Sequence, residues 1–109
     1  MRKKMKIGIV TISFNQAQYL TECIESVSIQ DQSQLSYVIV DAGSTDGSRD
    51  IIEKYRSRFQ KVICEPDNGP PDGLNKGFAS CDADIYGFLN SDDRFVPGAL
   101  DYVLTFFKR

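Results

Sequence analysis

The sequence of 109 residues contains no histidine, and its three cysteines, Cys23, Cys64 and Cys81, lie far apart. Zinc sites need closely spaced cysteine or histidine ligands, so the chain shows no motif of that kind. An odd number of distant cysteines also gives no disulfide framework, and we expect the reduced thiols of a cytoplasmic protein, two of them in the core. The apolar run over residues 7–12 is too short for a signal peptide or a membrane-spanning helix.

The chain also lacks an excess of positive charge. Its formal net charge of −2 gives no support for nucleic-acid binding. One basic cluster, made of Arg2, Lys3, Lys4 and Lys6, could touch an anionic membrane surface, although a solvated terminus is the simpler interpretation. The hydrophobic content of 41% and the charged content of 26% are those of a globular protein, and 109 residues suffice for one domain with one core.

Two kinds of apolar segment alternate along the chain. Short runs rich in β-branched residues predict strands over residues 6–13, 37–41, 61–65 and 85–89. Segments with one apolar face predict a helix that starts at Pro97 and three earlier helices over residues 16–30, 48–59 and 72–80. Asn15 is expected to cap the first helix, and Thr45, Asp46 and Ser48 the second. This alternation indicates an α/β fold, a Rossmann-like parallel sheet of about four strands flanked by helices.

Polar residues gather where each predicted strand ends, at residues 13–15, 41–44, 65–69 and 90–93. Strand ends lead into loops, and loops are polar in most proteins. In parallel sheets, however, ligands also bind outside the carboxyl ends of the strands. Acids, amides, hydroxyls and glycines at all four ends therefore predict a ligand site at this edge of the sheet.

The last of these ends carries two adjacent acids, Asp92 and Asp93. Like charges side by side repel, and each favours protonation of the other. A divalent cation removes that conflict, and carboxylate oxygens suit Mg²⁺ or Mn²⁺ together with the phosphates of a substrate. The alternative is a solvated turn, because aspartate and serine are common in turns.

Four motifs give these strand ends a family context: VTISFN at residues 10–15, VDAGSTDGS at 40–48, DGLNKGF at 72–78 and FLNSDD at 88–93. In this order and spacing they resemble glycosyltransferase family 2, over about residues 6–107. The resemblance implies the A-type fold of nucleotide-diphospho-sugar transferases. It also implies a UDP- or GDP-linked sugar donor, a sugar or lipid-linked hydroxyl acceptor, inversion at the transferred sugar, and a role in polysaccharide biosynthesis.

The resemblance also implies roles for residues near the nucleotide. Asp41 is expected to accept a hydrogen bond from a ring N–H of the base, or else to begin a turn. Ser13 and Phe14 are expected to line the base and ribose pocket, with Phe14 where the family often has tyrosine. Gly43 and Ser44 would let the backbone turn closely past the base.

The remaining implied roles concern the diphosphate and the cation. Asp92 is expected to bind the ribose and the metal, and Asp93 the metal, Mn²⁺ or Mg²⁺. The family's Asp-X-Asp motif has Asn90 at its first position here. Asp72 and Lys76 are expected to approach the sugar or diphosphate, while Asn75 and Gly77 have structural roles.

Members of this family usually continue for a further hundred or more residues, which carry the acceptor site and a carboxylate base. No residue after Asp93 is assigned that role, because Asp101 is expected to face solvent on the final helix. Residues 1–109 therefore look like the donor-binding half of a transferase. We expect no sugar transfer by this chain, and self-association through Phe106 or Phe107, because both cannot enter one small core.

Three other functions stay open. The chain could be a catalytically inactive nucleotide-binding module, which an assay of sugar turnover would distinguish. A phospho-receiver domain needs an acidic pair after its first strand, where this chain has Ser13, Phe14 and Asn15. A nucleotidyltransferase would normally show a basic, glycine-rich loop at the same place.

Overall fold

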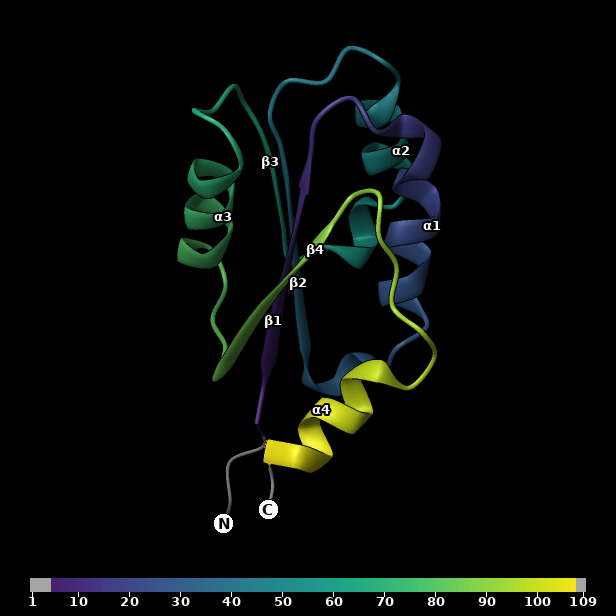
Figure 1. Cartoon of the computed structure of the whole chain (residues 1–109), viewed down its shortest axis with the longest axis vertical. Coiled ribbons are helices and arrows are strands. Elements are labelled where there is room, and N and C mark those ends of the chain that lie inside the picture. The colour runs from purple at the N-terminus through teal and green to yellow at the C-terminus, as the bar shows by residue number, and fades with distance from the viewer. Residues whose placement is uncertain (1–4, 108–109) are drawn as a thin grey trace.

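The computed structural model describes residues 5–107, except for the side chains of residues 106 and 107, and shows one four-stranded sheet (Figure 1). Its order is β3-β2-β1-β4, and all three strand pairs are parallel. The strands are β1 (Ile7–Ser13), β2 (Leu35–Asp41), β3 (Lys61–Cys64) and β4 (Ile85–Asn90). This confirms the predicted α/β architecture with a parallel sheet of four strands.

Helices cover both faces of this sheet, with α3 (Pro70–Ala79) on the side opposite α1 (Ala17–Ser28) and α2 (Ser48–Lys54) (Figure 1). The fourth helix is α4 (Ala99–Phe107), and two short 3₁₀ helices, η1 (Gln32–Gln34) and η2 (Arg56–Arg58), precede β2 and β3. None of the helices in the described part of the chain is long and apolar enough to cross a membrane.

The two faces of the sheet bury two apolar clusters. Ile7, Ile9 and Ile39 belong to the larger cluster, which α1, α2 and α4 complete. Val10 and Val38 belong to the smaller cluster under α3. Successive side chains of a strand point to opposite faces, so a strand covered on both sides has to be apolar throughout. This explains the continuous apolar run at the start of the sequence.

The cysteines are all free thiols, as predicted. Cys23 and Cys81 are buried and Cys64 is partly buried. Burial raises the pKa of all three thiols, because a thiolate loses its hydration inside the protein.

The second helix is shorter than the 48–59 predicted. It ends at Lys54, and η2 follows it. At this point the Tyr55 N–H is shared between the carbonyls of Ile51 and Ile52, at 3.2 and 3.1 Å. A shared bond of this kind tightens the last turn of an α-helix toward 3₁₀ geometry. The apolar spacing of the segment persists through Phe59, which is why the sequence pattern overran the helix.

Two predicted helix starts were wrong. The N-cap of α1 is Gln16, whereas Asn15 has a left-handed φ of 52° and its Oδ1 accepts a hydrogen bond from the Thr45 N–H at 2.9 Å. The last helix begins at Ala99 rather than Pro97, since Gly98 has a φ of +79° that an α-helix cannot contain. Other boundaries differ from prediction by one or two residues.

Candidate functional site

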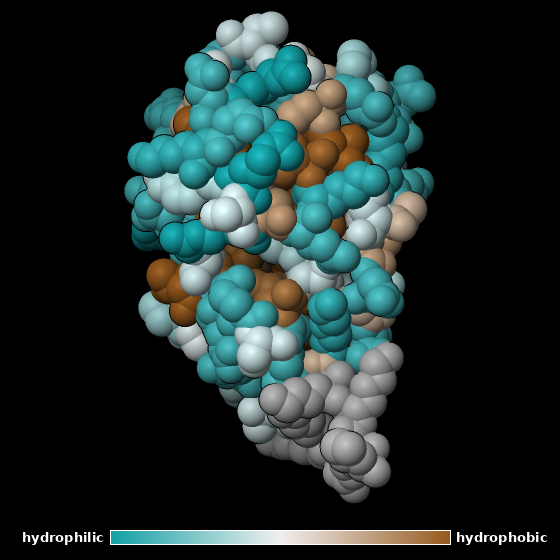
Figure 2. Space-filling model, turned by 180° about the vertical axis from the view of Figure 1, so that it is seen from behind, coloured by the Kyte–Doolittle hydropathy of each residue, from teal (hydrophilic) through white to brown (hydrophobic). Residues whose placement is uncertain are grey.

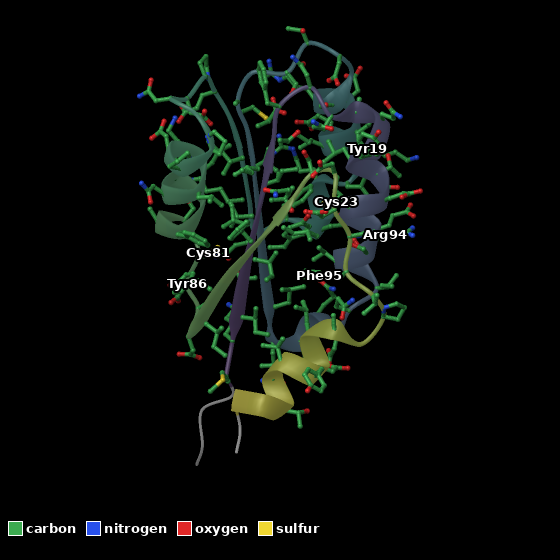
Figure 3. The ribbon with its side chains drawn as sticks, viewed as in Figure 1. Tyr19, Cys23, Cys81, Tyr86, Arg94 and Phe95 are labelled. Carbon is green, nitrogen blue, oxygen red and sulfur yellow. The ribbon has the colours of Figure 1, made fainter. Side chains whose placement is uncertain are left out.

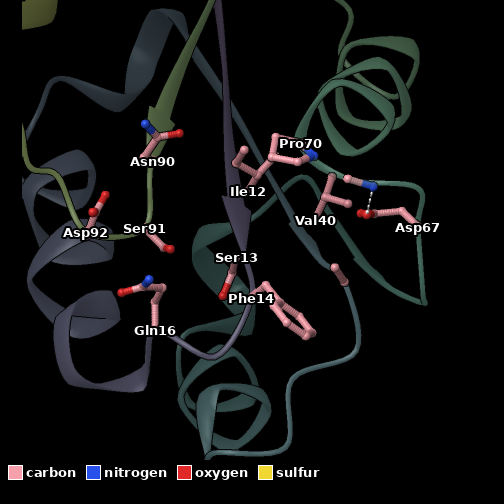
Figure 4. Close-up of a pocket in the computed structure, with 12 residues that line it drawn as sticks. Ile12, Ser13, Phe14, Gln16, Val40, Asp67, Pro70, Asn90, Ser91 and Asp92 are labelled. Carbon is pink, nitrogen blue, oxygen red and sulfur yellow. Dashed lines mark hydrogen bonds between the residues drawn. The ribbon is translucent and has the colours of Figure 1, made fainter.

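A cavity of about 500 Å³ opens at the carboxyl ends of β1, β2 and β4. Figure 4 shows its walls, with β1 between the β4 turn on one side and the start of α3 on the other. Its lining is Ile12, Ser13, Phe14, Gln16, Val40, Ala42, Asp67, Gly69, Pro70, Asn90, Ser91 and Asp92. Seen from behind the view of Figure 1, the molecular surface shows apolar side chains within a largely hydrophilic surface (Figure 2).

The cavity wall has an apolar part and a polar part. Ile12 and Val40 are half-buried or buried, while Phe14 keeps 57% of its surface exposed, so its ring is open to a ligand. Ser13 is 3% exposed, and its hydroxyl has no hydrogen-bond partner among the described residues. Buried hydroxyls are almost always paired in folded proteins, so an unpaired one on a cavity wall is suited to a ligand or a bound water.

The loop after β1 is tied to the loop after β2 by side-chain hydrogen bonds. The Asn15 N–H donates to Ser44 Oγ at 2.8 Å, and the Ala17 N–H donates to Asp46 Oδ2 at 2.9 Å. The Ser48 hydroxyl also donates to Asp46 Oδ1 at 2.6 Å. The bond from the Ser48 hydroxyl is the largest cause of a lowered pKa of Asp46, and the bond from the Ala17 N–H lowers this pKa further. The two loops therefore form one connected edge beside the cavity.

Asp41 lies behind this edge and not in the cavity lining. Its surface is fully buried, and its carboxylate accepts hydrogen bonds from the Gly43 N–H, the Ser44 N–H and the Ser44 hydroxyl, at 3.1, 2.8 and 2.6 Å. This is the turn-forming alternative of the sequence analysis. Oδ1 accepts only one of these bonds, so it keeps a free acceptor position, and the hydrogen bond of Asp41 with a base stays a prediction. Ala42, the next residue, lines the cavity.

The acid pair follows β4 in a tight turn. The Asp93 N–H donates to the Asn90 carbonyl at 2.9 Å, and both aspartates are exposed. Asp92 lines the cavity and Asp93 does not. The described residues contain no group of three or more acids, cysteines or histidines that could hold a metal by themselves. Two carboxylates fit Mg²⁺ or Mn²⁺ where a ligand's phosphates supply further oxygens.

The predicted contacts on α3 lie outside the cavity lining. Lys76 Nζ is 3.1 Å from Glu65 and 3.7 Å from Asp72, and it donates to the Pro66 carbonyl at 3.2 Å. The bond with Glu65 raises the pKa of Lys76. Asp72 also accepts from the Asn68 N–H at 2.9 Å. Both side chains brace the β3–α3 loop, and their predicted ligand contacts stay predictions.

That loop supplies lining residues that were not among the predicted site residues. Asp67, Gly69 and Pro70 face the cavity, and Asp67 holds its own loop by accepting from the Gly69 N–H at 2.9 Å (Figure 4). The acid- and glycine-rich end of the third strand was the available signal. Gln16, on the opposite wall, carried no signal beyond its place at the start of a helix.

Comparisons with known proteins agree with this geometry. The family model for glycosyl transferase family 2 matches residues 8–109. An uncharacterized glycosyltransferase of Nostoc sp., alr2836, is 36% identical over 107 residues, covering 95% of this chain and 33% of the relative. The putative teichuronic acid biosynthesis glycosyltransferase TuaG of Bacillus subtilis is 31% identical over 106 residues, covering 94% of this chain and 42% of the relative.

Solved structures show the same relationship. The structure of residues 1–349 of Staphylococcus aureus TarS in complex with UDP-GlcNAc has a TM-score of 0.87 at 28% identity, covering 95% of this chain and 31% of that one. The chain thus spans between about a third and two fifths of the proteins named here. With the parallel sheet, the cavity at its carboxyl edge and the family match over nearly all its length, the chain belongs to glycosyltransferase family 2.

Proposed function

We propose that this chain is the donor-binding part of an enzyme that transfers a sugar, with inversion, from a nucleoside-diphosphate sugar to a hydroxyl acceptor. Family membership supports the reaction class. The observation that supports this site is that Ser13, whose buried hydroxyl has no partner among the described residues, lines the same cavity as Asp92. A buried hydroxyl without a partner and an exposed acid, both in residues that line one cavity, support the binding of a ligand that has a nucleoside and phosphates.

The apolar part of the wall suits the base and ribose. The exposed ring of Phe14 and the side chains of Val40 and Ala42 offer flat, uncharged contact area. The Ser13 hydroxyl can donate to or accept from a polar edge of the nucleoside. Asp41 holds the Gly43–Ser44 turn beneath this wall through three donors, and its free acceptor position on Oδ1 would take the predicted hydrogen bond from a ring N–H of the base.

The diphosphate is assigned to the side of the β4 turn. Asp92 and Asp93 would hold a divalent cation together with the phosphates, and the exposure of both carboxylates leaves them free to do so. When bound, the cation neutralises the charge that grows on the leaving diphosphate. A mannosyltransferase of the same fold from Pyrobaculum calidifontis, 19% identical, was solved with GDP-Man and Mn²⁺, so Mn²⁺ is the first ion to test.

Calorimetric titration of the chain with UDP and GDP, each in Mn²⁺ and in chelator, tests this assignment. Asp92→Asn and Asp93→Asn should remove most of the gain in affinity that Mn²⁺ provides. Asp101→Asn is the matched control, because Asp101 is an exposed acid on α4 and does not line the cavity. Equal affinity of the parent chain in Mn²⁺ and in chelator would disprove the cation site.

Ser13→Ala tests the nucleoside side of the cavity. Removing one neutral hydrogen bond costs about 0.5–1.5 kcal/mol, which lowers affinity by roughly two- to tenfold, both with and without the cation. Unchanged affinity for both nucleotides would place the nucleoside elsewhere.

An inactive nucleotide-binding module stays the second candidate for the isolated chain. Asp101, the acid on the last helix, lies on α4, which sits at the opposite end of the sheet from the β1–α1 loop (Figure 1). We therefore expect this chain to bind nucleotide without transferring sugar. Transfer to an alcohol acceptor, lost on substitution of a residue within the chain, would contradict that expectation.

A further inference from the structure

We propose that three buried polar side chains, Cys23 and Ser26 of α1 and Gln30 just after it, position the segment that carries Asp92 and Asp93. We call these three residues the polar stripe. Spacings of three and four residues place them on one face of the helix and of the turn that follows it. The inference rests on the proposed function, because it gives the stripe a role in holding the two acids where the cation and the diphosphate need them.

The first contacts flank the acid pair on both sides. The Cys23 thiol donates to the carbonyl of Asn90, just before the acids, at a sulfur–oxygen distance of 3.5 Å. Ser26 Oγ accepts from the N–H of Phe95, just after them, at 3.0 Å. Figure 3 shows Phe95 and Arg94 on the α1 side of the molecule, near Cys23. The turn with the two aspartates is therefore fixed at both ends to one helix.

Gln30 fixes the following part of the segment with both atoms of its amide. Its Nε2 donates to the carbonyl of Val96 at 2.9 Å and to that of Ser26 at 3.1 Å. Its Oε1 accepts from the N–H of Leu100 at 3.2 Å. One side chain thus links two backbone groups of the segment to the end of α1.

Burial makes these contacts costly to lose. Cys23, Ser26 and Gln30 are 0%, 7% and 5% exposed, so water does not readily replace a lost partner. An ion pair between the same elements, Arg94 with Glu22 at 3.5 Å, joins side chains that are each 70% exposed and contributes little by comparison.

The main effect of these contacts is to restrict the conformations of the turn that carries Asp92 and Asp93. Asp92 and Asp93 are exposed, so only the backbone of their turn fixes where the carboxylates lie. A turn released at one end samples more conformations, and binding the cation then has to restrict it again. Loosening the stripe should therefore weaken the cation-dependent part of nucleotide binding and leave the cation-independent part unchanged.

Ser26→Ala tests the stripe, with Ser28→Ala as the matched control. The Ser28 hydroxyl bonds to the Ile24 carbonyl of its own helix at 2.9 Å and does not contact the segment. In the 109-residue chain, Ser26→Ala should lower the gain in UDP affinity on adding Mn²⁺ by roughly three- to tenfold. Its UDP affinity in chelator should match that of the parent, and Ser28→Ala should behave as the parent does in both conditions.

Amide hydrogen exchange of Phe95 gives a readout independent of nucleotide, since its N–H should exchange faster in Ser26→Ala. Ser26→Thr, which keeps the hydroxyl, should restore both properties. If Ser26→Ala does not fold, Cys23→Ala replaces it, because that variant loses the thiol donor to the Asn90 carbonyl and adds no buried charge. The same cation-specific loss is expected.

Three results would overturn the inference. The Phe95 amide could stay as protected as in the parent, or its protection could fall while the Mn²⁺-dependent gain stays intact. The third is an equal loss of UDP affinity in Mn²⁺ and in chelator, which would indicate general damage. If the parent itself shows no Mn²⁺-dependent gain, the proposed function fails first and the inference falls with it, which separates the two failures.

Discussion

The packing of α3 against the sheet depends on a glycine whose replacement has a calculable cost. A Cβ added at Gly77 would lie 2.4 and 2.8 Å from the two methyl carbons of Val10 on β1. Valine in a strand has few alternative rotamers, so either Val10 or α3 has to move. Overpacking of this kind costs about 1–3 kcal/mol, and the severity of this contact favours the upper half of that range.

The same substitution also has a favourable term. Alanine stabilises a helix interior by about 1 kcal/mol relative to glycine. The net expectation for Gly77→Ala is a loss of about 1–2 kcal/mol in the free energy of unfolding, or a fall of roughly 5–10 °C in Tm for a domain of this size. Urea and thermal unfolding followed by far-ultraviolet circular dichroism measure both quantities.

Gly73→Ala on the same helix is the matched comparison. Its added Cβ would meet Asp67 Oδ2 at 3.1 Å and an Ile12 methyl at 3.3 Å, contacts that small adjustments relieve. The helix gain and the contact cost should nearly cancel there. Val10→Ala should also reduce the cost of Gly77→Ala in a double-mutant cycle. A Gly77→Ala variant as stable as Gly73→Ala would refute the close approach of α3 to β1.

Other consequences can be tested on the same protein. Cys64 should react with a thiol reagent before Cys23 and Cys81, which are 0% and 7% exposed, as mass spectrometry of partly modified protein would show. Because the Asp46 pKa is lowered in the folded chain, its stabilisation is present above the ordinary value of 3.8 and lost as the pH falls through the lowered pKa. The Tm advantage of the parent over Asp46→Asn should therefore shrink below about pH 3.8, and a constant difference would contradict this. Phe88, 54% exposed on the edge strand β4, should support self-association at micromolar concentration, which Phe88→Lys should reduce in sedimentation velocity.

Self-association was first predicted from Phe106 and Phe107, whose side chains lie outside the described residues. The described surface points instead to β4. Tyr86 and Phe88 alternate along this strand with 47% and 54% of their surfaces exposed, although the Tyr86 ring packs edge-on against Phe78 at 5.8 Å. The prediction therefore stands on a different part of the chain.

The fold could be predicted because hydrophobic burial dictates it. A strand covered on both faces and a helix covered on one leave different apolar periods in the sequence, and those periods determined the order of the elements. Boundaries depend on single backbone bonds and dihedral angles instead. The shared N–H of Tyr55 and the left-handed Gly98 ended or delayed helices without changing the apolar pattern around them.

The sequence predicted which strand ends meet at the cavity. It predicted less well which way a single side chain at such an end points. Ser13 and Asp92 reach the cavity because the carboxyl ends of parallel strands meet at one edge. Asp41 occupies such an end too, but Val40 and Ala42 on either side of it line the cavity. The carboxylate of Asp41 is instead directed to the Gly43–Ser44 turn that it stabilises. A motif position alone does not specify that direction.

The cavity lies between two parts of the structure that are packed independently. Its α3 side, with Asp67, rests on the smaller apolar cluster, whereas the turn with Asp92 is held by α1 above the larger cluster. Gly77 allows the close packing of α3 on β1, and Ser26 accepts a hydrogen bond from the backbone that follows the acid pair. Because sites without shared partners contribute additively, loosening one side should not alter the cost of loosening the other. The α3 side of the cavity and the side of the β4 turn can therefore vary separately in one small sheet, each set by the helix that packs behind it.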